Sequence, residues 1–293
     1  MTDALTKAIE AGCLALTPEN YHSDEANRTY MSVSQYKTFL ACPARWTAQY
    51  VEQSWQPRQS DALALGTYFH ALVLEPETAE SVLEAEAEWL LTKGKTPKPT
   101  AGTTGIHTMA KRVLVTPDVR KWCEGEHETI HVGTLGGCFW KIKVDTLNLE
   151  EGWFSDLKSS ASLTREEYIS RLGTRGNFIH AYNYGLQLAV YQEILKQATG
   201  KTLQPVIVGV SKPTKGSPVP DMRVFRWDEE SMLQTILMEV RYGVAAVKKQ
   251  LAAGERGGRC ENLNSDCQYC VVSRTNWIVD IGEEPFNAYR AEG

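Results

Sequence analysis

GGCFWKIKVDTLNLEEGWFSDLKSS, residues 136–160, is the stretch that decides the fold, because it predicts two adjacent β-strands around which the chain is organised. Apolar residues alternate with polar ones from position 140 to 144, as in a half-buried strand. Apolar residues at 153, 154 and 157 indicate the next strand, and a polar turn separates the two.

The same stretch carries two acidic residues and one basic residue that we expect to converge. Residues two apart in a strand point the same way, so Asp156 and Lys158 share a face of the second strand. Asp145 ends the first strand beside Lys143. Carboxylate oxygens suit Mg²⁺ or Mn²⁺, and such an ion lowers the pKa of its bound water. The pattern predicts a site that hydrolyses a phosphodiester; the alternative is a hairpin with ordinary solvated Asp and Lys residues.

Asp145, ten further residues and then Asp156-Leu157-Lys158 resemble the PD-(D/E)XK nuclease motif in its RecB-like form. The resemblance implies an α/β fold with a mixed central sheet flanked by helices. It also implies that Asp145, Asp156 and the backbone carbonyl of Leu157 hold one or two divalent ions. Lys158 would then position or deprotonate the attacking water.

Residues 62–77, ALALGTYFHALVLEPE, predict a helix that breaks at Pro76 and is followed by a second helix. A single His within a helix is more often a core residue than a ligand. Here the segment resembles the G-x-x-x-H-x-L-V-L-E-P signature of the exonuclease VIII (RecE-like) branch. That resemblance implies that His70 contributes to the metal site.

A strong amphipathic helix is predicted over residues 180–199, with Gly200 ending it. Gln187 and Tyr191 are four residues apart and share one face of this helix. They resemble the Q-x-x-x-Y motif with which RecB-family nucleases hold DNA and orient the site. A helix at the edge of the core, with polar residues at its rim, is the alternative.

Four of the seven cysteines form a pattern. Cys260, Cys267 and Cys270 follow a C-x₆-C-x₂-C spacing, and Cys42 precedes Pro43 near the start of the chain. The RecB-like nucleases of the AddB and CRISPR-associated types take one Cys from before the nuclease core and three from after it. The resemblance implies a 4Fe-4S cluster, although the usual order is C-x₂-C-x₅-C. Zn²⁺ on the same ligands is the main alternative, and unligated thiols are another.

The remaining segments complete the predicted organisation. Residues 1–30 are predicted to be a tail or packing arm, 31–255 the nuclease domain, and 256–293 a Cys-containing segment that packs back on the N-terminal helix. Residues 92–117 are predicted to be a loop whose basic residues could touch a phosphate backbone.

Three further elements are predicted on the C-terminal side of the motif. A capping box of Thr164 and Glu167 predicts a short helix between residues 159 and 177. Two apolar strands near 203–213 and 222–227 predict a hairpin, and Ser34 and Asp228 are predicted to cap helices.

The composition sets limits on the class of protein. The chain has 293 residues, of which 42% are hydrophobic, enough for a sizeable core. The net charge of -5 argues against a protein that coats nucleic acid through bulk charge, but a local basic groove and a metal suffice for a nuclease. No secretory signal or membrane-spanning apolar run is evident, so we expect a soluble, cytoplasmic protein without disulfides.

Taken together, the motifs resemble a Mg²⁺-dependent DNA exonuclease of the exonuclease VIII type found in phages and prophages. The resemblance implies that one strand of duplex DNA is degraded and the other is passed to a single-strand annealing recombinase. It also implies a ring-shaped homo-oligomer. The alternatives are an iron-sulfur nuclease of the CRISPR-adaptation or helicase-linked type, and a non-catalytic DNA-binding module. No Walker A motif is present, so any helicase would be a separate protein.

Overall fold

A computed structural model of the chain describes residues 14–169, 173–227, 230–254, 256–260 and 267–273. Its centre is a five-stranded sheet with the order β1-β2-β3-β6-β7. The strands are β1 (Glu126–Leu135), β2 (Cys138–Asn148), β3 (Trp153–Ser160), β6 (Gln204–Ser211) and β7 (Met222–Arg226). The residues predicted to form the two motif strands are therefore β2 and β3, at the middle of the sheet.

The sheet is mixed. β1, β2 and β3 pair antiparallel, β3 and β6 pair parallel, and β6 and β7 pair antiparallel. Gly136 and Gly137 connect β1 to β2 with φ angles of 62° and 74°, a conformation that other residues adopt only with strain. The parallel pair needs a crossover, which α10 (Phe178–Ala181) and α11 (Tyr184–Thr199) provide.

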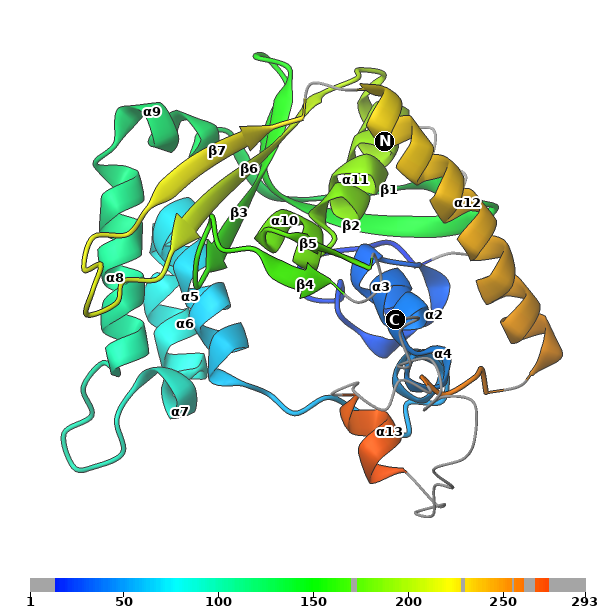
Figure 1. Ribbon diagram of the computed structural model, residues 1–293, viewed down its shortest axis with the longest axis horizontal. Helices are drawn as coiled ribbons and strands as arrows, with labels where there is room; N and C mark the ends of the chain where they lie inside the picture. Colours follow the sequence, from blue (N-terminus) through cyan, green and yellow to red (C-terminus); the bar gives the residue numbers. More distant parts are fainter. Residues whose placement is uncertain (1–13, 170–172, 228–229, 255, 261–266, 274–293) are drawn as a thin grey trace, which may run out of the picture.

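Helices cover both faces of the sheet, as Figure 1 shows. On one face, α5 (Asp61–Leu74) and α8 (Ala101–Leu114) pack together over β3 and β6. On the other face, α11 and α12 (Glu230–Ala253) pack with α3 (Val33–Ala41) over β1, β2 and β3. These layers confirm the predicted α/β fold with a mixed sheet flanked by helices.

Short elements surround this centre. They are α2 (Asp24–Thr29), α4 (Pro43–Trp46), the π-helical turn η1 (Thr47–Val51), η2 (Pro76–Thr78), α6 (Ala79–Ala85), α7 (Ala87–Leu90), α9 (Pro117–Arg120), η3 (Lys121–Cys123), β4 (Glu167–Ile169), β5 (Thr174–Gly176) and α13 (Gln268–Val272). Figure 1 shows α13 below α4, away from the sheet. Residues 14–30, part of the predicted N-terminal arm, pack near the outer strands through Tyr30 and Val132.

The prediction that residues 92–117 form a loop is wrong, because α8 occupies most of this segment. Thr100 caps the helix by accepting a hydrogen bond from the backbone N–H of Thr103. Ile106, Met109 and Val113 are buried against α5 at helical spacing. Glycines and threonines in the sequence weaken the helical signal, and burial against α5 outweighs their low propensity.

The helix predicted between residues 159 and 177 is also wrong. β4 and β5 form a small antiparallel hairpin there, with Glu167 paired with Gly176. Glu167 is in a strand and therefore does not complete the capping box that was predicted. The α3 helix begins after Ser32, which accepts a hydrogen bond from the Gln35 N–H, and not after Ser34 as predicted.

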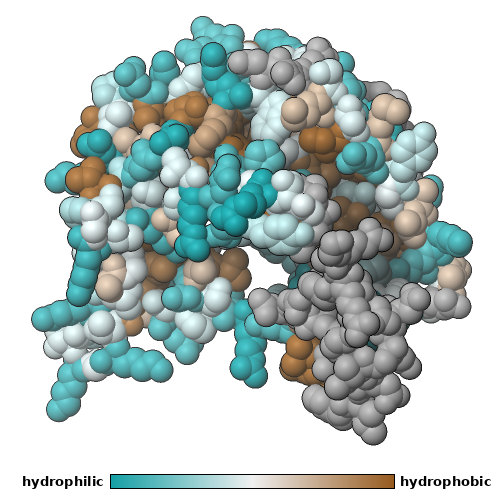
Figure 2. All heavy atoms as spheres, in the orientation of Figure 1, coloured by the Kyte–Doolittle hydropathy of each residue, from teal (hydrophilic) through white to brown (hydrophobic). Residues whose placement is uncertain are grey.

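The apolar strands predicted near residues 203–213 and 222–227 are confirmed as β6 and β7, and Gly200 ends α11 with φ of 73°. The predicted cap Asp228 lies outside the described residues. Within the described part of the chain, no helix combines the length and apolar composition that crossing a membrane would need. Figure 2 shows a mainly hydrophilic face with smaller apolar patches.

Candidate active site and cysteine cluster

The register of β2 and β3 places Asp145 beside Asp156. Thr146 pairs with Ser155, the last pair between the two strands counted from the turn that connects them. Asp145 and Asp156 are the next residues beyond this pair, where the two strands begin to separate. Asp145 Oδ2 accepts a hydrogen bond of 2.8 Å from the backbone N–H of Leu157, which bridges this separation. Both aspartates are buried, with 9% and 2% of their surface exposed.

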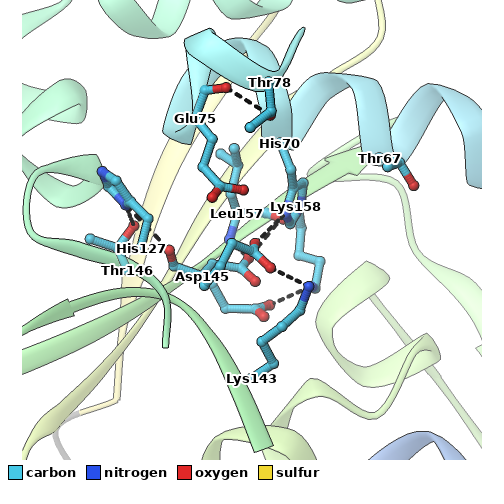
Figure 3. A network of polar contacts seen from close by, with 12 residues as sticks. Thr67, His70, Glu75, Thr78, His127, Lys143, Asp145, Thr146, Leu157 and Lys158 are labelled. Atoms are coloured by element: carbon cyan, nitrogen blue, oxygen red, sulfur yellow. Dashed lines mark hydrogen bonds and ion pairs between the residues drawn. The ribbon is translucent and has the colours of Figure 1, made fainter. Parts of the chain in front are cut away.

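α5, which packs on one face of the sheet, brings His70 to the same place. Its Nε2 lies 2.8 Å from the carbonyl oxygen of Leu157, and its Nδ1 lies 3.6 Å from Asp145 Oδ2. Figure 3 shows His70, Asp145, Leu157 and Lys158 directed toward one another. The sequence therefore predicted correctly that these segments converge, although His70 is 87 residues from Leu157 along the chain.

Glu128 is a further acidic residue at this site that the sequence did not single out. Its backbone has φ of 52°, and it interrupts the pairing of β1 with β2 between His127 and Thr129. The register of the two strands is the same on either side of this position, so Glu128 lies opposite Asp145. The left-handed backbone conformation accompanies a carboxylate whose Oε1 lies 4.0 Å from His70 Nδ1 and which forms an ion pair with Lys143. No spacing rule distinguishes Glu128 from neighbouring Glu126 in the sequence.

His70, Glu128 and Asp145 form a group whose ligand atoms all lie within 4.8 Å of one another. Burial disfavours the His70 imidazolium, but the charges of Asp145 and Glu128 outweigh it and raise the pKa of His70. Burial also raises the pKa of Asp145. Burial alone would raise the pKa of Glu128 too, but the contacts with His70 and Lys143 outweigh this effect and lower the Glu128 pKa to about 2.

Asp156 and Lys158 form the second part of the site, and α11 supports them. Lys158 Nζ lies 2.8 Å from Asp156 Oδ2, and Gln187 Nε2 donates a 2.7 Å hydrogen bond to Asp156 Oδ1. The contact of Lys158 with Oδ2 is an ion pair without hydrogen-bond geometry, so this buried oxygen has no hydrogen-bond donor. Burial disfavours the Lys158 ammonium, but Asp156 and Asp145 outweigh it and raise the pKa of Lys158 far above its ordinary value.

Tyr191 lies one turn after Gln187 and packs against the core. Its ring is 6.4 Å from that of Phe154, and burial raises the pKa of its hydroxyl well above the ordinary value. Tyr184 lies nearer to Lys158, with its ring centroid 5.5 Å from Lys158 Nζ. Gln187 thus contacts Asp156 and Tyr184 contacts Lys158, whereas the ring partner of Tyr191 is Phe154.

The donor set fits a divalent ion such as Mg²⁺ or Mn²⁺. Carboxylate oxygens, an imidazole nitrogen and a backbone carbonyl converge here, and Asp156 Oδ2 is a buried oxygen without a hydrogen-bond donor. The closest group contains Glu128 together with the predicted His70 and Asp145. Asp156 lies beside it, near enough for its charge to raise the pKa of Asp145 further.

The four patterned cysteines come together at a second place, below the helices that precede the sheet. Cys42 caps α4 by accepting a hydrogen bond from the Arg45 N–H, Cys267 directly precedes α13, and Cys260 lies in the segment between α12 and α13. Cys270 Sγ is 3.5 Å from both Cys42 Sγ and Cys260 Sγ, and all four sulfur atoms lie within 4.8 Å of one another. The structure therefore brings together the one N-terminal and three C-terminal cysteines.

The basic residues of the segment 92–117 are exposed and contact neither site. They are Lys93, Lys95, Lys98, Lys111 and Arg112. The side chain of Glu75, the residue that ends α5, points toward the group of His70, Asp145 and Leu157 in Figure 3, and burial followed by the charge of Glu128 raises its pKa.

Comparison with known proteins gives a family and a structural relative. A sequence profile described as a PDDEXK-like domain of unknown function, DUF3799, matches residues 32–272. A crystal structure described as a putative exonuclease from Eubacterium rectale is 27% identical and has a TM-score of 0.79, covering 95% of this chain and 100% of that one. A crystal structure of SSO0001 is 16% identical over 92% of each chain, and its TM-score of 0.35 is too low to support an argument. A search of curated proteins gave no significant match.

Proposed function

This chain belongs to the DUF3799 family of PDDEXK-like domains, and from that premise we propose that it is a nuclease that uses a divalent metal ion to hydrolyse DNA. One observation carries the proposal. Two aspartates on adjacent strands, a lysine and a histidine meet at one buried place, where Asp156 Oδ2 lacks a hydrogen-bond donor. A non-catalytic DNA-binding module would have no need for this arrangement.

Asp145, Asp156, Glu128 and His70 would hold the metal, together with the carbonyl oxygen of Leu157. A bound Mg²⁺ supplies a water of lowered pKa and offsets the charge of the phosphate that is attacked. The Asp145 carboxylate is held in place by the Leu157 N–H, and Asp156 by the Gln187 amide. These contacts fix the ligands before the ion arrives, which lowers the free energy needed to order the site.

Lys158 acts as a cation in this scheme. Its Nζ forms an ion pair with Asp156 at 2.8 Å, and the charges of Asp156 and Asp145 raise its pKa, so both favour the protonated ammonium. Lys158 Nζ therefore donates hydrogen bonds that position the attacking water and stabilise the charge that develops on the phosphate oxygens. A protonated Lys158 can position the attacking water but cannot deprotonate it, so we propose the positioning role of the two that the motif implies.

The finer assignment is an exonuclease of the phage and prophage type that produces single strands for an annealing recombinase. The similarity to the exonuclease VIII signature around His70 supports it, as does the likeness to the E. rectale protein described as a putative exonuclease. DNA is accordingly the proposed partner, together with a recombinase and with further copies of this chain in a ring.

The test uses purified protein on end-labelled linear duplex and on closed circular duplex, with Mg²⁺ or with EDTA. We expect digestion of the linear DNA alone, only with Mg²⁺, and a loss of at least a hundredfold in Asp156→Ala and Lys158→Ala. Lys196→Ala, which removes an exposed charge from the far end of α11, is the matched control and should retain wild-type activity. Equal digestion by wild type and both site variants would refute the catalytic assignment, and digestion of circular DNA would refute exonuclease action.

We also propose that Cys42, Cys260, Cys267 and Cys270 bind a metal centre that joins α4 to α13. Four thiols this close repel one another once deprotonated, so a cation is needed to hold them together as thiolates. Such a centre would attach the C-terminal segment to the helices that precede the sheet.

The sulfur spacing favours a single ion at this centre. Around one tetrahedral Zn²⁺, with Zn–S bonds of about 2.3 Å, neighbouring sulfurs are about 3.8 Å apart. The spacings of 3.5 Å and the limit of 4.8 Å bracket this distance. In a 4Fe-4S cluster each thiolate binds a different iron, so the sulfurs stand further apart. Zn²⁺ is thus the better fit here, ahead of the 4Fe-4S cluster that the resemblance implied.

Anaerobic purification followed by visible spectroscopy and metal analysis distinguishes Zn²⁺ from a 4Fe-4S cluster. Colourless protein with one zinc per chain is expected. Brown protein with four irons per chain would establish the cluster instead, and protein without either metal would remove the site.

A further inference from the structure

A cavity of about 690 Å³ lies next to Lys158. Lys158, Gln187 and Tyr191 line one side. The other walls come from residues 21–34, from α3 and from the η1 turn. The cavity thus connects the active site with the segment that precedes the nuclease motifs.

Lys141, which lines this cavity, is an unusual residue for its environment. It lies on β2 four residues before Asp145 and is 1% exposed. Its ammonium donates to the carbonyl oxygen of Tyr21 and, at 2.8 Å, to Asn27 Oδ1, and it lies 4.7 Å from the centre of the Tyr21 ring. All of these partners are neutral.

No carboxylate of the described residues forms an ion pair with Lys141, although Asp24 also lines the cavity. Burying an ammonium without an opposite charge is unfavourable, and buried charges in proteins are normally paired or ligand-bound. Burial lowers the pKa of Lys141 to about 8, so the side chain is still mostly charged at neutral pH. Two of its three N–H donors are used by Tyr21 and Asn27, and the third has no hydrogen-bond partner among the described residues.

Lys37 adds a second positive charge to the same cavity. Its Nζ donates to the Tyr182 carbonyl oxygen at 2.8 Å and lies 5.2 Å from the centre of the Tyr184 ring. With Lys158 on the catalytic side, three lysines surround a space whose other lining is mainly aromatic, amide and hydroxyl side chains. This is the chemistry that binds phosphate and the flat face of a nucleobase.

The size of the cavity restricts its occupant further. A DNA duplex is about 20 Å wide and cannot enter a space of this volume, whereas an unpaired nucleotide can. Lys141 contacts none of the metal-site side chains, and its Cα lies about 13 Å along the strand from that of Asp145. The phosphate that Lys141 contacts is therefore not the one that is cleaved.

We propose that this cavity binds the unpaired end of the strand being cut and that Lys141 contacts its terminal phosphate. This inference rests on the proposed nuclease function and specifies its substrate as a strand end that carries a phosphate. Binding of the end at a fixed position would place a nearby phosphodiester over Asp145 and Asp156, so that cleavage starts at ends.

The experiment measures binding in EDTA, so that no cleavage occurs. Single-stranded oligonucleotides of one sequence carry a 5′-phosphate, a 3′-phosphate or hydroxyls at both ends. Wild-type protein should bind one of the phosphorylated forms about tenfold more tightly than the hydroxyl form, the effect of one hydrogen bond to a charged group. Lys141→Met should lose this preference, and Lys196→Met, the control for one lost positive charge, should keep it.

Equal wild-type affinity for all three oligonucleotides would overturn the proposal, and this comparison also decides the matter if Lys141→Met does not fold. A Lys141→Met variant that weakens all three equally would assign Lys141 to an internal phosphate and would also overturn it. The binding result is independent of catalysis. A wild-type protein that shows the preference but cleaves no DNA with Mg²⁺ would therefore contradict the proposed function and leave the end-binding cavity in place.

Discussion

Gln187 offers a sharp test of how α11 supports the metal site. Its amide donates a 2.7 Å hydrogen bond to Asp156 Oδ1, and Asp156 is 2% exposed, so water cannot replace the lost donor without a rearrangement. Gln187→Leu removes this donor and keeps the volume of the side chain similar. The Asp156 carboxylate is then free to turn away from the position in which it would bind the ion.

The magnitude follows from the charge on the acceptor. A hydrogen bond to a charged group contributes about 1.5–3 kcal/mol, and the loss of a group that orients a metal ligand weakens metal binding about 10- to 100-fold. The Mg²⁺ concentration for half-maximal digestion should therefore rise by this factor in Gln187→Leu. The rate at saturating Mg²⁺ should fall much less, because Asp156 and Lys158 are still present.

The assay combines calorimetric titration of Mn²⁺ with the Mg²⁺ dependence of linear-duplex digestion. Gln192→Leu is the matched control, since Gln192 lies on the same helix, is 7% exposed and donates at 2.9 Å to the neutral Leu203 carbonyl. It should lower stability without a change in metal affinity. Unchanged Mn²⁺ affinity in Gln187→Leu, or an equal decrease in both variants, would refute the role given to Gln187.

Three further outcomes are expected. Met109→Ala should lower the free energy of unfolding by about 2–5 kcal/mol in urea titrations, because this fully buried side chain fills the contact of α8 with α5; a change below about 1 kcal/mol would contradict that packing. The Lys141 pKa of about 8 lies below the ordinary value of 10.5, so between these pH values the unfolded chain binds more protons than the folded chain. The free energy of unfolding of wild type, relative to that of Lys141→Met, should therefore rise by up to about 3 kcal/mol from pH 8 to 10.5, and a difference that is constant with pH would contradict the lowered pKa. Cys270→Ser should lose its bound metal and melt at lower temperature, whereas Cys123→Ser, a buried thiol outside the cluster, should keep its metal; equal metal content in both would contradict the site.

The sequence predicted the parts of the fold that depend on strong local patterns. The strands around Asp145 and Asp156 and the helix of Gln187 have clear apolar periodicity, so their positions followed from the residues alone. The α8 helix was missed because Gly and Thr residues obscure its apolar stripe, which becomes evident only when α5 is seen to cover it. A helix propensity at Thr164–Glu167 was likewise overridden by pairing with residues 174–176.

The residues of the candidate site that belong to sequence motifs were predictable, and those placed by tertiary structure were not. Motif spacing selected Asp145, Asp156 and Lys158, and the likeness to a signature selected His70. Glu128 could not be selected, since its backbone has a positive φ angle opposite Asp145 and no residue pattern marks that conformation. Lys141 reads in the sequence as an outward polar residue of an alternating strand, and only the structure shows that residues 21–27 bury it.

The central claim is that Asp145 and Asp156 share a divalent ion, and crystals soaked in Mn²⁺ test it most directly through the anomalous signal of the metal. We expect a peak within coordination distance of both carboxylates in the wild type and no peak in crystals of Asp156→Ala. Manganese bound by His70 and Glu128 without either aspartate, or no peak at this place, would contradict the account.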